Sequence, residues 1–198
     1  MASDPQPVRV VAFARFPVAG MCKTRLIPAV GAEGAATIHT KLVESCIAAM
    51  RGSGLTTELH VTGADLSAFR DWLGEDIRFI DQGEGDLGDR LARAAAPYPV
   101  IFIGSDAPDL HEGRLIAAAK ALASAPAVIG PAEDGGYYLL GLNAPAPWLF
   151  NDMDWGTETV FEETMRRFSA HGIAPTVLET LADLDRPEDL ARWPELTR

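Results

Sequence analysis

The chain has 198 residues, of which 47% are hydrophobic and 23% are charged. This composition excludes a disordered chain and is typical of one globular domain, which we expect to span residues 1–198. The formal net charge of −11 argues against nucleic acid or an anionic membrane as a partner, because their phosphates would repel the protein.

Strand-like and helix-like segments alternate along the first two thirds of the chain. Apolar, β-branched runs predict strands at Val8–Phe13, Glu58–Thr62, Ile77–Ile80 and Val100–Ile103. Helical spacing of apolar residues predicts helices at Ala32–Met50, Leu66–Leu73, Leu87–Ala96 and Glu112–Ser124. A repeated strand-then-helix order indicates right-handed βαβ units and a mostly parallel sheet with helices on both faces.

The pattern changes after residue 124. Two apolar strands, Ala127–Ile129 and Tyr137–Leu142, flank a polar turn that contains Gly135 and Gly136, which predicts a hairpin. A helix at Glu158–Ala170, a strand at Thr176–Leu178 and a short helix opened by Arg186 and Pro187 complete the prediction. The expected fold is therefore a three-layer α-β-α domain with one antiparallel hairpin strand. In such folds ligands bind at the carboxyl ends of the strands.

The sequence gives no sign of an exported protein. Cys22 and Cys46 form no CxxC pair, and the four histidines lack zinc-site spacing and are assigned no role. The polar start and the short apolar run after it do not resemble a signal peptide, and no stretch approaches the ~20 apolar residues of a membrane helix. We therefore expect the protein to be located in the cytoplasm.

The loop after the first strand, Arg15–Leu26, is basic. It lies within Pro5–Ala32, a stretch with four basic residues and no acid. Gly20 allows close approach of the backbone to a ligand, while Lys23 and Arg25 offer an ammonium and a planar guanidinium to phosphate oxygens. It is not a Walker A loop, because proline and cysteine occupy the two glycine positions. A solvated basic surface loop is the alternative.

A GxGxxG pattern at Gly83–Gly88 follows a predicted strand and precedes a helix. With Asp106 eighteen positions later it matches a dinucleotide-binding fingerprint. Against this interpretation, Glu84, Asp86 and Asp89 place negative charge where a pyrophosphate needs donors. The alternative is that the segment is a purely structural turn.

Two strand-end carboxylates suggest a metal. Val100–Ile103 runs directly towards Asp106 and Asp109; Asp109 fits an N-cap of the next helix, whereas Asp106 fits an oxygen ligand for Mg²⁺. Asp185 either simply precedes a helix with Pro187 in its first turn or brings a second carboxylate to that metal.

Two further segments fit an acceptor site. The turn at Glu133–Tyr138 is explained equally well by hairpin geometry and by close substrate approach. In Asp152–Glu158, Thr157 is a possible N-cap, and Trp155 either covers an acceptor pocket or simply packs.

Six motifs, in this order, carry a resemblance over nearly the whole chain: FARFPVAGMCKTRLIP, QGEGDLGDRL, IGSDAPDL, GPAEDGGYYLLGL, DMDWGTETVF and LADLDRPEDL. They resemble a bacterial group labelled glycosyltransferase or radical-SAM/selenodomain-associated transferase, of the nucleotide-diphospho-sugar transferase superfamily with the GT-A fold. More distantly, the chain is similar to 2-phospholactate guanylyltransferases and molybdenum-cofactor nucleotidyltransferases.

The resemblance implies roles for individual residues. Lys23 and Arg25 would hold a triphosphate, Asp106 and Asp185 would hold Mg²⁺ or Mn²⁺, and Lys23, Arg25 and Asp106 would be catalytic. The expected nucleotide-binding residues are Arg15, Gly20, Lys23, Arg25, Gln82, Gly83, Gly88 and Ser105, with Gln82 and Gly88 near the base. The expected acceptor-binding residues are Asp134, Gly135, Gly136, Tyr137, Trp155 and Thr157. The chain departs from the guanylyltransferases at Tyr137 and Tyr138 and at WGTET, which puts a phospholactate-like acceptor in question.

These observations favour a Mg²⁺-dependent nucleotidyltransferase that uses a nucleoside triphosphate and a small phosphorylated or hydroxylated acceptor. We expect cations on one wall of the site, metal carboxylates on the opposite wall and the phosphates between them. A glycosyltransferase that uses an NDP-sugar, with a base such as Asp134, is the alternative. A regulatory nucleotide-binding protein without turnover is less favoured, because sensing would not require two metal carboxylates.

Overall fold

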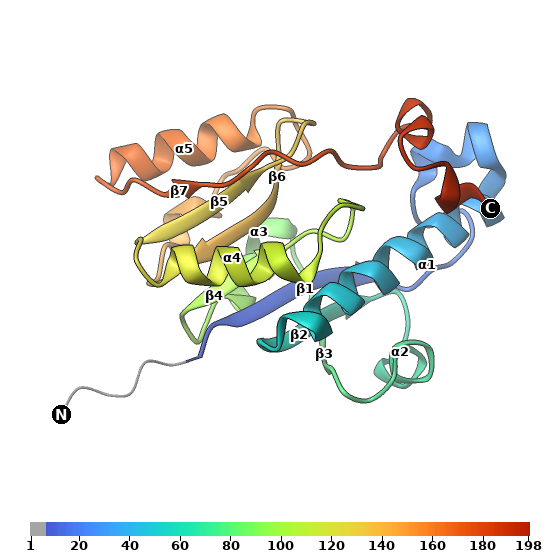
Figure 1. The fold of residues 1–198 in the computed structure, drawn as a ribbon, viewed down its shortest axis with the longest axis horizontal. Helices are drawn as coiled ribbons and strands as arrows, with labels where there is room; N and C mark the ends of the chain where they lie inside the picture. Colours follow the sequence, from blue (N-terminus) through green and yellow to red (C-terminus); the bar gives the residue numbers. More distant parts are fainter. Residues whose placement is uncertain (1–6) are drawn as a thin grey trace.

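The structure is a computed structural model and describes residues 7–198. One seven-stranded sheet, with the order β3-β2-β1-β4-β6-β5-β7, forms its middle layer (Figure 1). The strands are β1 (Arg9–Arg15), β2 (Thr56–Thr62), β3 (Arg78–Asp81), β4 (Val100–Ile103), β5 (Ala127–Pro131), β6 (Tyr137–Leu142) and β7 (Thr176–Val177). The α-helices are α1 (Ile27–Ser53), α2 (Leu66–Leu73), α3 (Leu87–Ala94), α4 (Glu112–Leu122) and α5 (Val160–Ala170). The 3₁₀ helices are η1 (Thr24–Leu26), η2 (Pro147–Leu149), η3 (Pro187–Ala191) and η4 (Pro194–Thr197).

The sheet is mostly parallel, as the sequence predicts. β6 pairs antiparallel with both β4 and β5, whereas the β1–β2, β1–β4, β2–β3 and β5–β7 pairs are parallel. The predicted hairpin is therefore confirmed, and β6 is placed between β4 and β5. The start of β6 consequently lies at the same edge of the sheet as the carboxyl ends of its neighbours.

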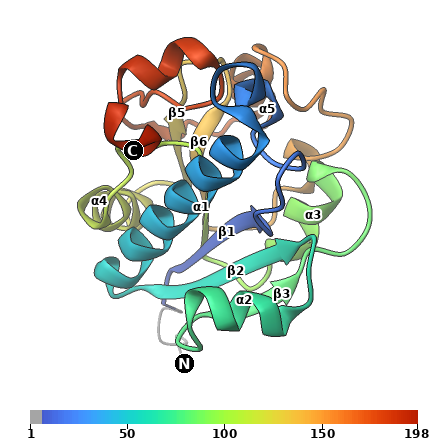
Figure 2. The ribbon, with the colours of Figure 1, turned by 90° about the vertical axis from the view of Figure 1, so that its right-hand side faces the viewer.

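Helices cover both faces of the sheet. Helices α1, α2 and α4 lie on one face and α3 and α5 on the other (Figure 2). Their apolar residues pack into two separate core clusters, one on each face. The central strand β4 is buried on both faces, which explains its uninterrupted apolar sequence VIFI. None of the helices within residues 7–198 is both long and apolar enough to cross a lipid bilayer.

Helix α1 begins earlier than predicted. It starts at Ile27 instead of Ala32 and carries Pro28 in its first turn. Gly31 interrupts it with a φ of 72°, a left-handed conformation that glycine adopts without steric cost. The basic loop that precedes α1 follows the carboxyl end of β1 directly.

Two predicted helix caps are wrong. The N-cap of α4 is His111, and Asp109 instead accepts a hydrogen bond from the indole of Trp193 at 3.3 Å. The N-cap of α5 is Thr159, and Thr157 Oγ1 donates to a backbone carbonyl of its own loop at 2.8 Å. In each case the loop continues for two more residues before the helical backbone begins, so the earlier polar side chain lies outside the cap.

The C-terminal segment returns to the beginning of α1 (Figure 2). A separate apolar cluster there joins Leu26, Ile38 and Leu42 to Leu184 and Trp193. Its burial stabilises the return of a segment that has almost no regular strand of its own. The acidic stretch around residue 185 is thereby placed beside the basic loop.

The strand order reverses its direction next to β1. The chain moves from β1 outward to β2 and β3 and then crosses back to β4 on the other side of β1. The loops that follow β1 and β4 therefore separate in opposite directions and leave a crevice at the carboxyl ends of these strands.

At the opposite end of the sheet a buried ion pair joins β1 to β2. The guanidinium of Arg9 binds the carboxylate of Glu58, and both residues are less than a tenth exposed. Arg9 also donates to the carbonyls of Ala94, Ala95 and Pro97 at 2.9, 3.2 and 3.1 Å. The guanidinium of Arg9 is therefore occupied by the Glu58 carboxylate and lies at the end of the sheet opposite the crevice.

Replacing Glu58 with glutamine should destabilise the fold. The substitution leaves the Arg9 guanidinium buried without its counter-charge, and we expect the free energy of unfolding to fall by about 3 kcal/mol, measured by urea denaturation. Asp76→Asn, which breaks an exposed pair with Arg51, is the control and should change stability much less. Equal losses in both variants would contradict the structural role of the buried pair.

Candidate nucleotide and acceptor site

The ammonium of Lys23 is the centre of the site. Its Nζ lies 2.8 Å from Asp106 Oδ1 and 3.8 Å from Asp185 Oδ1, and it donates to the Leu184 carbonyl at 2.6 Å. The Lys23 side chain is only 5% exposed. Arg25, which is largely exposed, forms an ion pair with Asp185. Three chain segments, after β1, after β4 and before η3, therefore meet at one cation.

This arrangement corrects one prediction. We expect from the sequence that cations and carboxylates stand on opposite walls, but Lys23 and Arg25 contact the carboxylates directly. The physical reason is that a buried ammonium requires counter-charges, and Asp106 and Asp185 are the acids nearest to it. The loop is thus not a merely solvated basic surface loop.

A cavity of about 500 Å³, which we call the basic cavity, opens beside Lys23. Of the predicted site residues, it is lined by Arg15, Lys23, Arg25, Gln82, Ser105, Asp106 and Asp185. Arg90 from α3 also lines it, which gives the cavity four basic side chains. Gly20, Gly83 and Gly88 are not among its lining residues.

The predicted base-side residues have structural partners. Gln82 is buried, and its Nε2 donates to the carbonyls of Ala14 and His60 at 3.1 and 3.0 Å. Its Oε1 accepts from Arg90 at 2.7 Å. The Gln82 side chain therefore ties β1 to β2 and orients Arg90 towards the basic cavity.

The GxGxxG segment has the structure of a capped turn. Asp86 accepts from the backbone N–H of Asp89 at 2.9 Å, and Asp89 accepts from that of Asp86 at 3.2 Å, which forms a capping box. Arg90 and Arg93 donate to the carbonyls of Gly85, Gln82 and Glu84. The N-terminus of α3 is thus occupied by the protein's own carboxylates, which argues against a pyrophosphate bound there.

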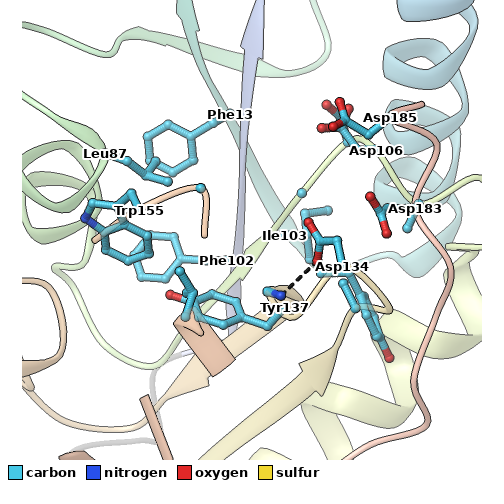
Figure 3. Close-up of a pocket in the computed structure, with 18 of the residues that line it drawn as sticks. Phe13, Leu87, Phe102, Ile103, Asp106, Asp134, Tyr137, Trp155, Asp183 and Asp185 are labelled. Carbon is cyan, nitrogen blue, oxygen red and sulfur yellow. Dashed lines mark hydrogen bonds between the residues drawn. The ribbon is translucent and has the colours of Figure 1, made fainter. Parts of the chain in front are cut away.

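A second cavity, of about 400 Å³, adjoins the first; we call it the amphipathic cavity (Figure 3). Of the predicted acceptor residues it is lined by Asp134, Gly136, Tyr137, Trp155 and Thr157. Phe13, Ser105, Asp106 and Asp185 line both cavities. A ligand that extends from one cavity into the other would therefore pass Asp106 and Asp185.

Gly135 lies next to this cavity without lining it. Its φ is 87°, and a Cβ atom there would lie 2.1 Å from the Glu158 carbonyl oxygen. Its own carbonyl accepts from the Phe161 N–H at 2.8 Å. The absence of a side chain lets the β5–β6 turn pack directly on the start of α5.

Gly88 has a comparable packing role on the other side of the cavity. A Cβ atom at Gly88 would lie 2.4 Å from the Phe150 carbonyl oxygen and 2.9 Å from Trp155 Nε1. Trp155 thus packs against α3, as one of its two predicted interpretations has it, and also lines the cavity; its role towards an acceptor stays a prediction.

Sequence reasoning missed several site residues. Phe13, Leu87 and Phe102 form part of the apolar side of the amphipathic cavity, and Arg90 completes the basic cavity. Phe13 could have been identified as a site residue because it lies near the end of a predicted strand. Leu87 could have been identified because it lies at the predicted start of a helix. Asp183 also lines the amphipathic cavity. It could have been identified because it lies two residues before Asp185 in the same extended segment.

Asp183 is the most perturbed carboxyl group of the site. Burial, together with the negative charge of Asp134, raises its pKa to about 6. Burial also raises the pKa of the Tyr137 hydroxyl, so this group stays protonated at neutral pH. The amphipathic cavity thus disfavours additional negative charge.

The carboxylates fit a divalent cation held jointly with a substrate. Asp106 and Asp185 converge on one point, since both lie within 4 Å of the Lys23 ammonium. Within residues 7–198, no three histidine, cysteine or acidic side chains gather closely enough to hold a metal by themselves. Mg²⁺ commonly takes one or two carboxylates and completes its coordination with substrate phosphates and water, and this donor set meets that requirement.

Solved structures share the fold. A protein from Desulfovibrio desulfuricans G20, described as a nucleotide-diphospho-sugar transferase, is 29% identical; the match covers 95% of this chain and 87% of that one, with a TM-score of 0.85. A nucleotidyl transferase from Methanothermobacter thermautotrophicus is 17% identical, with 98% of each chain covered and a TM-score of 0.61. Rv0371c of Mycobacterium tuberculosis H37Rv, in complex with manganese, is 16% identical, with 96% and 99% covered and a TM-score of 0.56.

The fold and the crevice define a transferase of the nucleotide-diphospho-sugar superfamily, which confirms the resemblance seen in the sequence. A family model described as "Uncharacterized protein conserved in bacteria (DUF2064)" matches residues 45–157. The chain belongs to this DUF2064 family. A search of the curated proteins found no match to the sequence.

Asp183 should impose a specific pH dependence on stability. Because its pKa is about 6 in the folded state and ordinarily 3.8, the folded state binds more protons between these values. The free energy of unfolding should therefore fall as the pH rises from about 4 to about 6. Asp183→Asn should flatten this slope in urea denaturation with a chelator present, and Asp109→Asn should leave it unchanged. A steeper slope in the Asp183 variant would contradict this interpretation.

Proposed function

We propose that the protein is a Mg²⁺-dependent nucleotidyltransferase. It would transfer a nucleoside monophosphate from a nucleoside triphosphate to a small phosphorylated or hydroxylated acceptor and release pyrophosphate. Mn²⁺ is the other cation that this proposal allows, and the manganese in the complex of Rv0371c supports a divalent metal. A reaction that consumes nucleoside triphosphates agrees with the cytoplasm expected from the sequence.

The observation that carries the proposal is the set of basic side chains around one cavity. Arg15, Lys23, Arg25 and Arg90 line the basic cavity at the carboxyl ends of β1 and β4. Two of these groups, Lys23 and Arg25, pair with Asp106 and Asp185 in the structure. A divalent cation on these carboxylates would offset their charge. The four basic groups would then match a triphosphate, whose charge is the highest among the common nucleotides. The nucleotidyl transferase of the same fold supports the same reaction class.

In this proposal each charged group has a defined task. Arg15, Arg25 and Arg90 bind phosphate oxygens, and Asp106 and Asp185 hold the divalent cation. Bound there, that cation would neutralise charge on the phosphates. Lys23 keeps the two carboxylates together and stabilises negative charge that moves onto the leaving pyrophosphate.

The bond changes are simple. An oxygen of the acceptor forms a bond to the α-phosphorus, and the bond from the α-phosphorus to the bridging oxygen of the β-phosphate breaks. Pyrophosphate leaves with the electron pair of that bond. A hydroxyl acceptor gives up its proton, whereas a phosphate dianion has none to lose. Positioning and charge neutralisation supply most of the catalysis in such transfers.

A glycosyltransferase that uses an NDP-sugar is the second candidate. The Desulfovibrio protein with 29% identity, described as a nucleotide-diphospho-sugar transferase, favours it. In that case the divalent cation would serve a diphosphate leaving group, and Asp134 would act as a base. The number of cations around the basic cavity favours the triphosphate.

The two candidates differ in their products. We expect the purified protein with Mg²⁺ and a single NTP to release pyrophosphate only when a pool of phosphorylated and hydroxylated acceptors is present, as measured by a coupled pyrophosphate assay. Each NDP-sugar is tested separately with the same pool. Release of free NDP from an NDP-sugar, without pyrophosphate from any NTP, would reject nucleotidyl transfer and favour the glycosyltransferase.

Asp106→Asn tests the metal carboxylate. We expect kcat/KM to fall by about 100-fold or more, because charge neutralisation at the phosphates is lost. Asp109→Asn is the matched control, since Asp109 lies three residues further along and lines neither cavity. If Asp106→Asn bound nucleotide with unchanged dependence on Mg²⁺, the assignment of Asp106 to the metal would be wrong.

A further inference from the structure

The amphipathic cavity has an apolar side that phosphate chemistry does not use. Phe13, Leu87, Phe102, Tyr137 and Trp155 lie on one side of it, opposite the carboxylates (Figure 3). Leu87 is 41% exposed, which is unusual for a large aliphatic side chain. Phe13 is partly exposed although the residues just before it on β1 are buried. Exposed apolar side chains around a cavity of this size are typical of small-molecule sites.

The opposite side of the same cavity is acidic. Asp106, Asp134, Asp183 and Asp185 line it, and in the part of the chain that the structure describes no lysine, arginine or histidine lines this cavity. The nearest ammonium, that of Lys23, is already paired with Asp106. Among the described residues, neither Asp134 nor Asp183 forms an ion pair, although the charge of Asp134 acts on Arg25 and that of Lys23 acts on Asp183.

The N-terminus of α5 does not provide an anion site here either. Helix α5 points its N-terminus at this cavity, but the N–H groups of Val160, Phe161 and Glu163 already donate to carbonyls of the protein. Glu162 adds negative charge to its first turn, whereas Glu163 in the same turn is paired with Arg166 and Arg167. The favourable end of the helix dipole is thus compensated within the protein.

We propose that the amphipathic cavity binds the acceptor and selects an alcohol with an apolar body and no phosphate or carboxylate group. This inference rests on the proposed function and narrows it, since it chooses between the phosphorylated and the hydroxylated acceptor. The apolar body lies against Phe13, Leu87 and Trp155, and the hydroxyl points towards Asp134 and Asp106. Phosphate groups bind in the basic cavity only.

With an alcohol as the acceptor, both the leaving pyrophosphate and the hydroxyl proton have a destination. The alcohol oxygen forms the bond to the α-phosphorus while pyrophosphate leaves, and the hydroxyl proton passes to Asp134. Asp134 Oδ1 accepts from the Gly136 N–H at 2.8 Å, which holds the carboxylate at the cavity wall, and Oδ2 makes no hydrogen bond within residues 7–198. Asp134 therefore has an oxygen free to take the proton.

Direct binding tests the selectivity without any turnover. The probes are 3-phenylpropan-1-ol, its phosphate monoester and 3-phenylpropanoate, titrated against the protein by ligand-observed NMR in the absence of nucleotide and metal. We expect the alcohol to bind at least about tenfold more tightly than either anion, a difference of about 1.4 kcal/mol. The double variant Asp134→Asn with Asp183→Asn should reduce this ratio, because it removes the charges that repel the anions.

Leu87→Glu tests the apolar side. Leu87 is exposed at the first position of α3, where an acid is compatible with the helix dipole, so the variant should fold. We expect it to weaken binding of the alcohol by about tenfold while the Kd of an NTP stays unchanged. Val177→Glu, an exposed apolar residue of β7 that lines neither cavity, is the matched control.

The outcomes separate this inference from the proposed function. Three outcomes would overturn it, whatever the pyrophosphate assay gives. The phosphate monoester could bind as tightly as the alcohol, the alcohol could fail to bind at millimolar concentration, or Leu87→Glu could leave the Kd of the alcohol unchanged. Selective binding of the alcohol without release of pyrophosphate from any NTP would reject nucleotidyl transfer and keep the acceptor class.

Discussion

The buried ammonium of Lys23 is the interaction on which the site depends. A cation that is 5% exposed needs nearby anions, and Lys23 finds them in Asp106 after β4 and Asp185 in the returning C-terminal segment. Its hydrogen bond to the Leu184 carbonyl, and that of the Leu184 N–H to the Asp106 carbonyl, fix these segments to each other. The same contacts bring two carboxylates to one point, which is what a shared divalent cation requires.

The ion-pair cluster also divides the crevice by charge. Asp106 and Asp185 line both cavities; on one side four basic groups join them around the basic cavity, and on the other side aromatic rings, Asp134 and Asp183 join them around the amphipathic cavity. A polyanion and a neutral molecule are thus favoured in different places, with Asp106 between them. This division supports a transfer reaction in which only one of two substrates carries high charge.

Most of the fold and part of the site could be predicted because they depend on local patterns. The apolar run of β4, the glycine turn before β6 and the basic loop each have a signature of a few residues. The predicted cap at Asp109 failed because the loop continues to His111 before the helical backbone begins. Asp183 was overlooked because its pKa depends on burial and on Asp134, which is distant in sequence.

The sequence by itself determined the kinds of groups present: an acid-free basic loop, carboxylates after a buried strand and near the C-terminus, and an alternation of strands and helices. The tertiary structure alone decided which of them meet. Lys23 pairs with Asp106 instead of facing it across a gap, and Gln82 binds the backbone of β1 and β2. The physical reason is that burial makes pairing obligatory for charged and polar groups, and burial depends on contacts between distant segments.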